Sequence, residues 1–197
     1  MGITTGILLF DDAEELDFAG PWEVFTMAAK LKPEDRVVTI APSREPVRAA
    51  KGLRVLPDHS FADAPQLDVV VVPGGQGTRR EVNNPVLIDW LRKAGAQCRW
   101  VTSVCTGALL LHEAGFAKGK RITTHWGFIE QLRARGDAEV LEKVRYVRDG
   151  NVVTSAGVSA GIDMALWLVG QIHDVATARQ VQHFIEYDPA PPYTADV

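Results

Sequence analysis

Apolar stretches that suit β-strands alternate with amphipathic stretches that suit helices along most of this chain. The clearest strand pattern is "LDVVVV" (residues 67–72), a continuous β-branched run typical of a strand buried on both faces of a parallel sheet. "CRWVTSV" (98–104) is a second buried strand, and "NPVLIDWLRKAGAQ" (84–97) between them has helical periodicity. The alternation predicts an α/β fold: a doubly wound, mainly parallel sheet with helices on both faces.

The same alternation continues toward both ends of the chain. We expect further strands at 3–10, 35–41 and 121–125, hairpins at 47–57 and 144–157, and helices at 20–31, 106–116, 126–135, 159–174 and 175–188. Pro21 then lies in the first turn of its helix, where a missing N–H costs nothing. The Pro-rich tail, residues 188–197, is expected to lie extended over the surface.

Length and composition suit one soluble globular domain spanning residues 1–197. Hydrophobic residues make up 46% and charged residues 23%, both ordinary for such a domain. A net charge of −4 gives no electrostatic reason to expect a nucleic-acid partner. No apolar run approaches the roughly 18 residues needed to span a bilayer, so we expect no membrane partner. The N-terminus lacks the pattern of a signal peptide and the chain has only two cysteines, which favours a cytoplasmic location.

Three loops follow predicted strands and should meet at one edge of the sheet. They are "FDDAEELDFAG" (10–20), "PGGQG" (73–77) and "VCTG" (104–107). In a doubly wound sheet, ligands bind outside the carboxyl ends of the strands, where the strand order reverses. The sequence therefore predicts that an acidic loop, a glycine-rich loop and a cysteine surround one site.

Cys105 ends a buried strand and is followed at once by a helix. A free cysteine is most often a small buried hydrophobe, and that interpretation stays open. The alternative is a nucleophile held out by a sharp strand-to-helix turn. There the N–H groups of the helix are expected to lower the thiol pKa from about 8.5 toward about 4–7. Cys98, at the far end of the same strand, is expected to be structural.

The glycine-rich loop "PGGQGTRR" (73–80) fits neither common phosphate-binding pattern, because Arg80 stands where the third glycine is needed. Its other use is to present a backbone N–H to developing negative charge. We expect the N–H groups of Gly75 and Thr106 to form such an oxyanion-type site beside the thiol.

Asp17 differs from the other acidic residues of its loop because Leu16 and Phe18 flank it. A carboxylate just before a helix is usually an N-cap. In an apolar pocket near a thiolate, however, desolvation and like charge would raise its pKa, and it would then act as a general acid and base. The five histidines show no metal-ligand spacing, so we expect no metal site.

Five motifs in this order resemble those of the ThiJ/PfpI superfamily, with coverage from residue 3 to 187. They are "LDFAGP" (16–21), "VVPGG" (71–75), "VTSVCTGALLL" (101–111), "TTHW" (123–126) and "AGIDMAL" (160–166). Within the superfamily, the chain is most similar to the isonitrile hydratase group and to the sensor domains of AraC-type regulators.

This resemblance implies a single flavodoxin-like domain, of the class I glutamine-amidotransferase-like type, that forms a homodimer and needs no cofactor. It implies that Cys105 is the nucleophile and that Asp17 assists it. The thiolate would attack the terminal carbon of an isonitrile, a small-molecule electrophile, to give a thioimidate. Asp17 would then help water release an N-substituted formamide, which is the chemistry of a hydro-lyase. Trp126 and Val158 fall where the family builds its apolar pocket.

Differences between this chain and the wider superfamily narrow the set of activities that the resemblance implies. Its peptidases and deglycases have a histidine after the cysteine or a glutamate at the acidic position, whereas this chain has Thr106 and Asp17. The amidotransferase relatives use a C-terminal H-x-E pair, which His183 and Glu186 do not match in spacing. Two alternatives stay open. One is a solitary, non-enzymatic ligand or redox sensor without the regulators' DNA-binding domain, and the other is a cysteine hydrolase or deglycase acting on another small electrophile.

Overall fold

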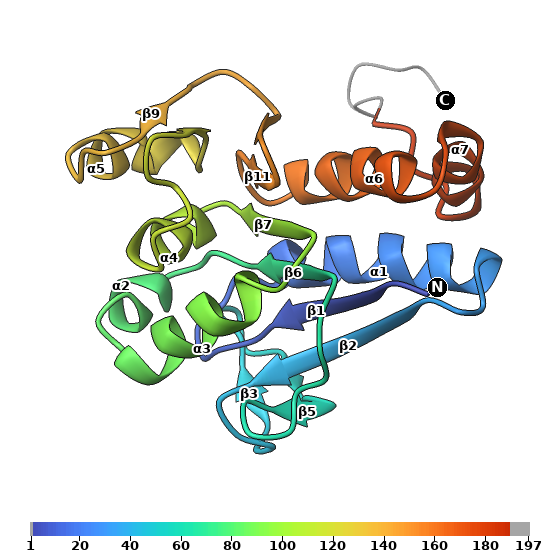
Figure 1. Ribbon diagram of the computed structural model, residues 1–197, viewed down its shortest axis with the longest axis horizontal. Helices are drawn as coiled ribbons and strands as arrows, with labels where there is room; N and C mark the ends of the chain where they lie inside the picture. Colours follow the sequence, from blue (N-terminus) through green and yellow to red (C-terminus); the bar gives the residue numbers. More distant parts are fainter. Residues whose placement is uncertain (1, 190–197) are drawn as a thin grey trace.

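A seven-stranded sheet forms the centre of the part of the chain that the computed structural model describes, residues 2–189 (Figure 1). Its strand order is β10-β11-β7-β6-β1-β2-β5. The strands are β1 (Thr4–Leu8), β2 (Arg36–Ala41), β5 (His59–Ser60), β6 (Val69–Val72), β7 (Trp100–Val104), β10 (Tyr146–Asp149) and β11 (Val152–Ser155). All neighbours are parallel except β10 and β11. The predicted mainly parallel sheet is therefore confirmed, and β6 is fully buried as its valine run indicated.

Helices cover both faces of this sheet (Figure 1). On one face α1 (Glu15–Leu31), α6 (Ala160–Ile172) and α7 (Val175–Phe184) pack together, and on the other lie α3 (Pro85–Gly95) and α4 (Gly107–Glu113). The chain moves from β1 to β2 in one direction and from β6 to β7 in the other. Right-handed crossovers then place their connecting helices on opposite faces. The strand order thus reverses between β1 and β6, where ligands bind in such sheets.

A small second layer covers the outer side of α4. It contains β8 (Arg121–Ile122), the 3₁₀-helix η1 (Trp126–Phe128), α5 (Ile129–Arg133) and β9 (Glu139–Val140). Their buried apolar side chains form a separate cluster with Ala108 and Leu109 of α4. The strand expected at 121–125 is only two residues long and pairs with β9 outside the main sheet.

Both predicted hairpins are present. The first pairs β3 (Val47–Arg48) with β4 (Arg54–Val55) as a separate antiparallel ribbon. The second pairs β10 with β11, and β11 also pairs in parallel with β7, so this hairpin extends the main sheet.

The predicted start of the first helix was wrong: α1 begins at Glu15, and Pro21 lies inside it rather than in its first turn. Glu15 and Asp17 stand in the first turn, where negative charge suits the unpaired N–H groups of a helix. This acidic turn marks the start of the helix, and it brings Asp17 onto the helix instead of the preceding loop. The tail prediction for 188–197 falls almost wholly outside the described residues. No helix within residues 2–189 has the length and apolar character needed to cross a bilayer.

Candidate active site

Cys105 occupies the predicted turn between β7 and α4. Its φ angle is +56°, a left-handed conformation that costs a residue other than glycine of order 1–3 kcal/mol. The side chain is 7% exposed. The thiol is therefore held at the carboxyl end of the sheet by a strained backbone, which is the geometry of a nucleophile elbow.

Asp17 reaches the same point from the first turn of α1, and its side chain is fully buried. Its Oδ2 accepts a hydrogen bond from the Gly74 N–H at 2.9 Å, and its Oδ1 accepts one from the Val158 N–H at 3.0 Å. The Cys105 thiol donates to the same carboxylate. Asp17 is therefore not an N-cap: two loops far apart in sequence hold its carboxyl group against the thiol.

Burial is the largest influence on the pKa of the Asp17 carboxyl group and on that of the Cys105 thiol. It raises the pKa of Asp17 to about 7, aided by the charge of Glu14 and opposed by the backbone donors of Gly74 and Val158. Burial, and next the Asp17 carboxylate, raise the pKa of the Cys105 thiol to about 12. The expectation of a depressed thiol pKa was wrong, because these two effects outweigh the Thr106 donors. At neutral pH the pair therefore holds a neutral thiol beside a carboxyl group that is about half ionised.

The backbone donors of the site differ in part from the predicted pair. Thr106, through its N–H and hydroxyl, lowers the pKa of the Cys105 thiol, and its Oγ1 donates to the Gly75 carbonyl at 3.2 Å. The Gly75 N–H instead donates to Thr106 Oγ1 at 3.0 Å. Gly75 thus contacts the thiol only through Thr106, while Gly74 holds Asp17.

The close packing of these loops explains the glycine at position 74. A Cβ added there would lie 2.5 Å from the Thr106 nitrogen and 2.8 Å from the Cys105 Cβ. Both distances are shorter than van der Waals contact, so a side chain at this position would push the two loops apart. The "VVPGG" motif therefore contributes a close approach as well as a donor.

A cavity of about 530 Å³ opens beside the thiol, lined by Thr123, Thr124, His125, Trp126, Ile129, Glu142, Lys143, Val144, Arg145, Ala156, Gly157 and Val158. Cys105 does not line this cavity, but it lies behind the wall residue Gly157, on which a built Cβ would be 3.6 Å from the sulfur. The predicted pocket residues Trp126 and Val158 both line this cavity. Trp126 is 83% exposed at its rim, while Val158 also holds Asp17 through its N–H.

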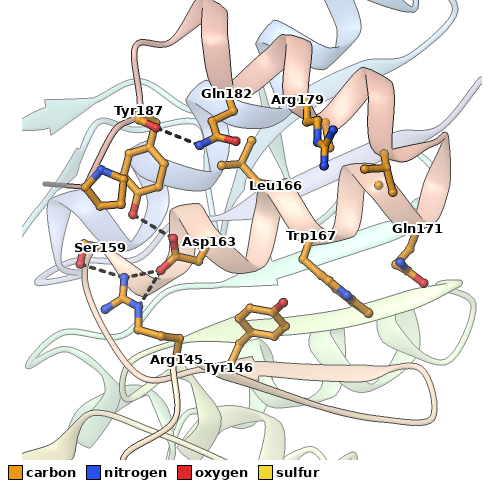
Figure 2. A pocket seen from close by; sticks show the side chains of 14 residues that line it. Arg145, Tyr146, Ser159, Asp163, Leu166, Trp167, Gln171, Arg179, Gln182 and Tyr187 are labelled. Carbon is orange, nitrogen blue, oxygen red and sulfur yellow. Dashed lines mark hydrogen bonds and ion pairs between the residues drawn. The ribbon is translucent and has the colours of Figure 1, made fainter.

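A larger groove of about 1060 Å³ lies along α6, α7 and the β10 end of the hairpin (Figure 2). There the Asp163 carboxylate accepts from the Arg145 guanidinium and from the Tyr187 hydroxyl. Neither Cys105 nor Asp17 lines this groove. Neither residue lines the smaller cavity either, but Gly157 and Val158 of its wall lie against Cys105 and Asp17, so the smaller cavity is the one adjacent to the thiol.

Sequence reasoning missed the Val158 N–H and the role of Gly74 as a donor to Asp17. The glycine pair in "VVPGG" signalled a close approach, but nothing in the chain indicated that residue 158 would meet residue 17. Cys98 is buried at the other end of β7, its sulfur donates to the Ala94 carbonyl at 3.3 Å, and burial raises its pKa to about 12. Residues 2–189 contain no cluster of three His, Cys, Asp or Glu side chains arranged to hold a metal ion.

A cysteine at a strained strand-to-helix turn, faced by a buried carboxyl group at the switch point of a doubly wound sheet, defines an α/β protein with a candidate nucleophilic thiol. The DJ-1/PfpI family model matches residues 5–171, and the chain belongs to this family. The match confirms the resemblance that the motifs indicated.

Proteins similar to this chain in sequence or in structure support the family assignment. The isonitrile hydratase of Pseudomonas putida is 42% identical over 193 residues, covering 98% of this chain and 82% of that protein. The crystal structure of a ThiJ/PfpI family protein from Pseudomonas syringae has a TM-score of 0.90 and 32% identity, covering 100% of this chain and 80% of that one. The HTH-type transcriptional regulator GbdR of Pseudomonas aeruginosa is 29% identical over 93% of this chain and half of the regulator. The flavodoxin-like fold is thereby confirmed.

Proposed function

We propose that this protein hydrates isonitriles to N-substituted formamides, with Cys105 as the nucleophile and Asp17 as the proton carrier. The observation that carries the proposal is the Asp17 carboxyl group, buried beside the thiol with a pKa of about 7. Such a group exchanges protons readily at neutral pH, which is the property that a general acid and base needs. The 42% identity to an isonitrile hydratase supports this choice of substrate.

In the first half of the reaction the thiol adds to the isonitrile. The Asp17 carboxylate takes the thiol proton while the sulfur attacks the terminal carbon of R–N≡C. Protonated Asp17 then gives that proton to the carbon, which leaves the thioimidate R–N=CH–S on Cys105. The high thiol pKa makes this coupled transfer necessary, because a free thiolate is scarce at neutral pH.

In the second half water cleaves the thioimidate. Asp17 takes a proton from water as its oxygen attacks the carbon, and passes the proton to the nitrogen. The C–S bond of the resulting R–NH–CH(OH)–S adduct then breaks, R–NH–CHO leaves, and the hydroxyl proton returns through Asp17 to the sulfur. One water is consumed and both side chains are regenerated.

The cavity suits this substrate because its wall combines apolar groups with an open rim. Ile129, Val144 and Val158 line it, and the Trp126 ring stands at its edge. An alkyl or aryl R group would lie among these side chains while its isocyano carbon faces the thiol. The Thr106 N–H stabilises negative charge on the sulfur as it forms.

Incubation with a simple aryl or alkyl isonitrile tests the proposal. We expect the wild-type protein to release formamide, measured by ultraviolet absorbance and mass spectrometry, and Cys105→Ala to release none. The Cys98→Ser variant is the matched control and should retain full turnover, since Cys98 is buried at the opposite end of β7. No formamide from folded wild-type protein would refute isonitrile hydration.

A ligand or redox sensor is the second candidate, favoured by the match of this chain to half of a transcriptional regulator. Asp17→Asn separates the two functions: turnover collapses in a hydratase, whereas ligand binding or thiol oxidation survives in a sensor. A cysteine hydrolase or deglycase would instead turn over another small electrophile through Cys105 and release no formamide from an isonitrile. The homodimer and the cytoplasmic location stay predictions, to be tested by sedimentation and by localisation of the tagged protein.

A further inference from the structure

Val158 has a backbone conformation that its own side chain disfavours. Its φ angle is +47°, in the left-handed region that a β-branched residue rarely adopts. In this conformation its N–H donates to Asp17 Oδ1 at 3.0 Å and is one of the two backbone donors that hold the buried carboxyl group. Strained conformations of this kind persist only where the surrounding structure enforces them. The contacts that hold the chain around Val158 therefore also hold Asp17.

Arg145, which directly precedes β10, binds the chain on both sides of Val158. Before Val158, the Ala156 N–H donates to the Arg145 carbonyl at 2.9 Å. After Val158, the Arg145 guanidinium donates from Nη2 to Ser159 Oγ at 3.3 Å and from Nε to Asp163 Oδ2 at 2.6 Å (Figure 2). The strained residue thus lies between two points of the chain that the same arginine holds.

The two side chains that accept from the Arg145 guanidinium are themselves fixed, because both belong to the start of α6. Ser159 is the N-cap of this helix, but its hydroxyl makes no capping hydrogen bond, so its oxygen is free to accept from Arg145. Asp163 stands in the first turn, and its Oδ1 accepts from the Tyr187 hydroxyl at 2.9 Å. Charge-assisted hydrogen bonds to partners held in this way are stronger and more directional than those of a solvated arginine.

We propose that Arg145 is a positioning residue for Asp17: by binding the chain on both sides of Val158, it enforces the left-handed conformation that directs the Val158 N–H at the Asp17 carboxyl group. This inference rests on the proposed role of Asp17 as the proton carrier, but not on the identity of the electrophile. Arg145 acts on Asp17 through the backbone of residues 156–159.

The ionisation of Asp17 reports whether the Val158 donor is in place. This N–H lowers the pKa of Asp17, because a hydrogen bond to the carboxylate favours the charged form. If the N–H moves away, Asp17 keeps its proton to a higher pH. The other titratable groups around the carboxyl group lie on different elements: Glu14 precedes α1, Cys105 lies in the turn after β7, and His125 lies beyond the cavity wall beside Cys105.

Urea denaturation of paired proteins follows this ionisation. The difference in unfolding free energy between a protein and its Asp17→Asn variant, measured from pH 5 to pH 9, levels off above the pKa of Asp17 in the folded state. We expect Arg145→Gln to move the pH of levelling upward by about one unit, which corresponds to the loss of one hydrogen bond to a charged group. Ser159→Ala, which removes one of the contacts, should move it less in the same direction.

The matched control is Arg148→Gln. Arg148 lies on the same hairpin, but it donates to the Gly150 carbonyl and its guanidinium lies over the Trp100 ring. This variant should leave the pH of levelling unchanged. Circular dichroism and thermal unfolding confirm that every variant is folded.

Val158→Gly decides whether Arg145 acts through the backbone conformation. Glycine adopts a positive φ angle without strain and keeps the N–H, so we expect Arg145→Gln to cause little shift in the Val158→Gly background. A direct effect of the Arg145 charge on Asp17 would instead cause the same shift in both backgrounds, which would overturn the proposal. An unchanged pH of levelling in Arg145→Gln alone would overturn it as well.

The two proposals fail in different assays. Absence of formamide from the wild-type protein refutes isonitrile hydration but leaves the comparison of Asp17 ionisation intact. Unchanged ionisation of Asp17 in Arg145→Gln refutes the role of Arg145 and leaves hydration by Cys105 and Asp17 intact.

Discussion

Replacement of Asp17 by asparagine should remove a pH-dependent part of the stability of this protein. The carboxyl group has an ordinary pKa of 3.8, and burial, which disfavours its charge, raises that pKa to about 7 in the folded protein. Between these pH values the unfolded chain has lost the proton and the folded protein has kept it. The proton therefore stabilises the folded state fully below pH 3.8, and this contribution is lost as the pH rises toward 7.

The two pKa values set the size of the effect. Each pKa unit corresponds to about 1.4 kcal/mol, so the whole contribution is about 4 kcal/mol. Between pH 5 and pH 7, wild-type protein should lose about 2.5 kcal/mol of unfolding free energy relative to Asp17→Asn. The amide also places an NH₂ group against the N–H of Gly74 or Val158, which costs about 1–3 kcal/mol at every pH.

Urea denaturation of both proteins at pH 5, 6, 7 and 8 measures this difference. Asp89→Asn is the matched control, because the Asp89 carboxylate lies at the surface and pairs with Arg92; it should show no comparable slope. A difference between wild type and Asp17→Asn that stays constant from pH 5 to pH 7 would mean that Asp17 is ionised throughout. The proposed proton carrier would then lack its titration near neutrality.

Three further measurements probe the packing and the cavity. Gly74→Ala should cost about 2–3 kcal/mol of unfolding free energy by urea denaturation and slow Cys105 alkylation, because the new methyl meets the Thr106 backbone. With the wild-type protein, mass spectrometry should find iodoacetamide on Cys105 and not on Cys98, and Asp17→Asn should speed the alkylation of Cys105, because it removes the carboxylate that raises the thiol pKa. Trp126→Ala should leave stability within about 0.5 kcal/mol, and should raise KM for aryl isonitriles by about two- to tenfold relative to alkyl ones. Equal KM changes for both classes would exclude contact between the Trp126 ring and the substrate.

Local periodicity was enough to predict most of the fold. The four valines of β6 are buried on both faces of the sheet, because a continuous run of apolar residues has no polar face that could contact water. The Asp149-Gly150-Asn151 turn gave the hairpin of β10 and β11 for a similarly local reason. The start of α1 escaped prediction because two local signals competed, and the acidic turn at Glu15 prevailed over Pro21.

The candidate site was predictable as a set of residues but not as a set of contacts. Cys105, Asp17 and the glycine loop came together because the carboxyl ends of parallel strands meet at one edge. The partners of Asp17 were not predictable, since Gly74 and Val158 lie 57 and 141 positions away. The sign of the thiol pKa change was missed for the same reason, because burial and the Asp17 charge are properties of the packed site.

The sequence by itself determined the α/β class, the strand-to-helix turn at Cys105 and the family, since these depend on side-chain periodicity and on motifs that are continuous in the chain. Only the tertiary structure decided that Asp17 titrates near neutrality and that the Gly75 N–H donates to Thr106 Oγ1 instead of to the thiol. Desolvation and hydrogen-bond partners are set by atoms brought together from distant parts of the chain. The sequence pattern therefore identifies the reactive side chains, and the packing of the site determines their pKa values.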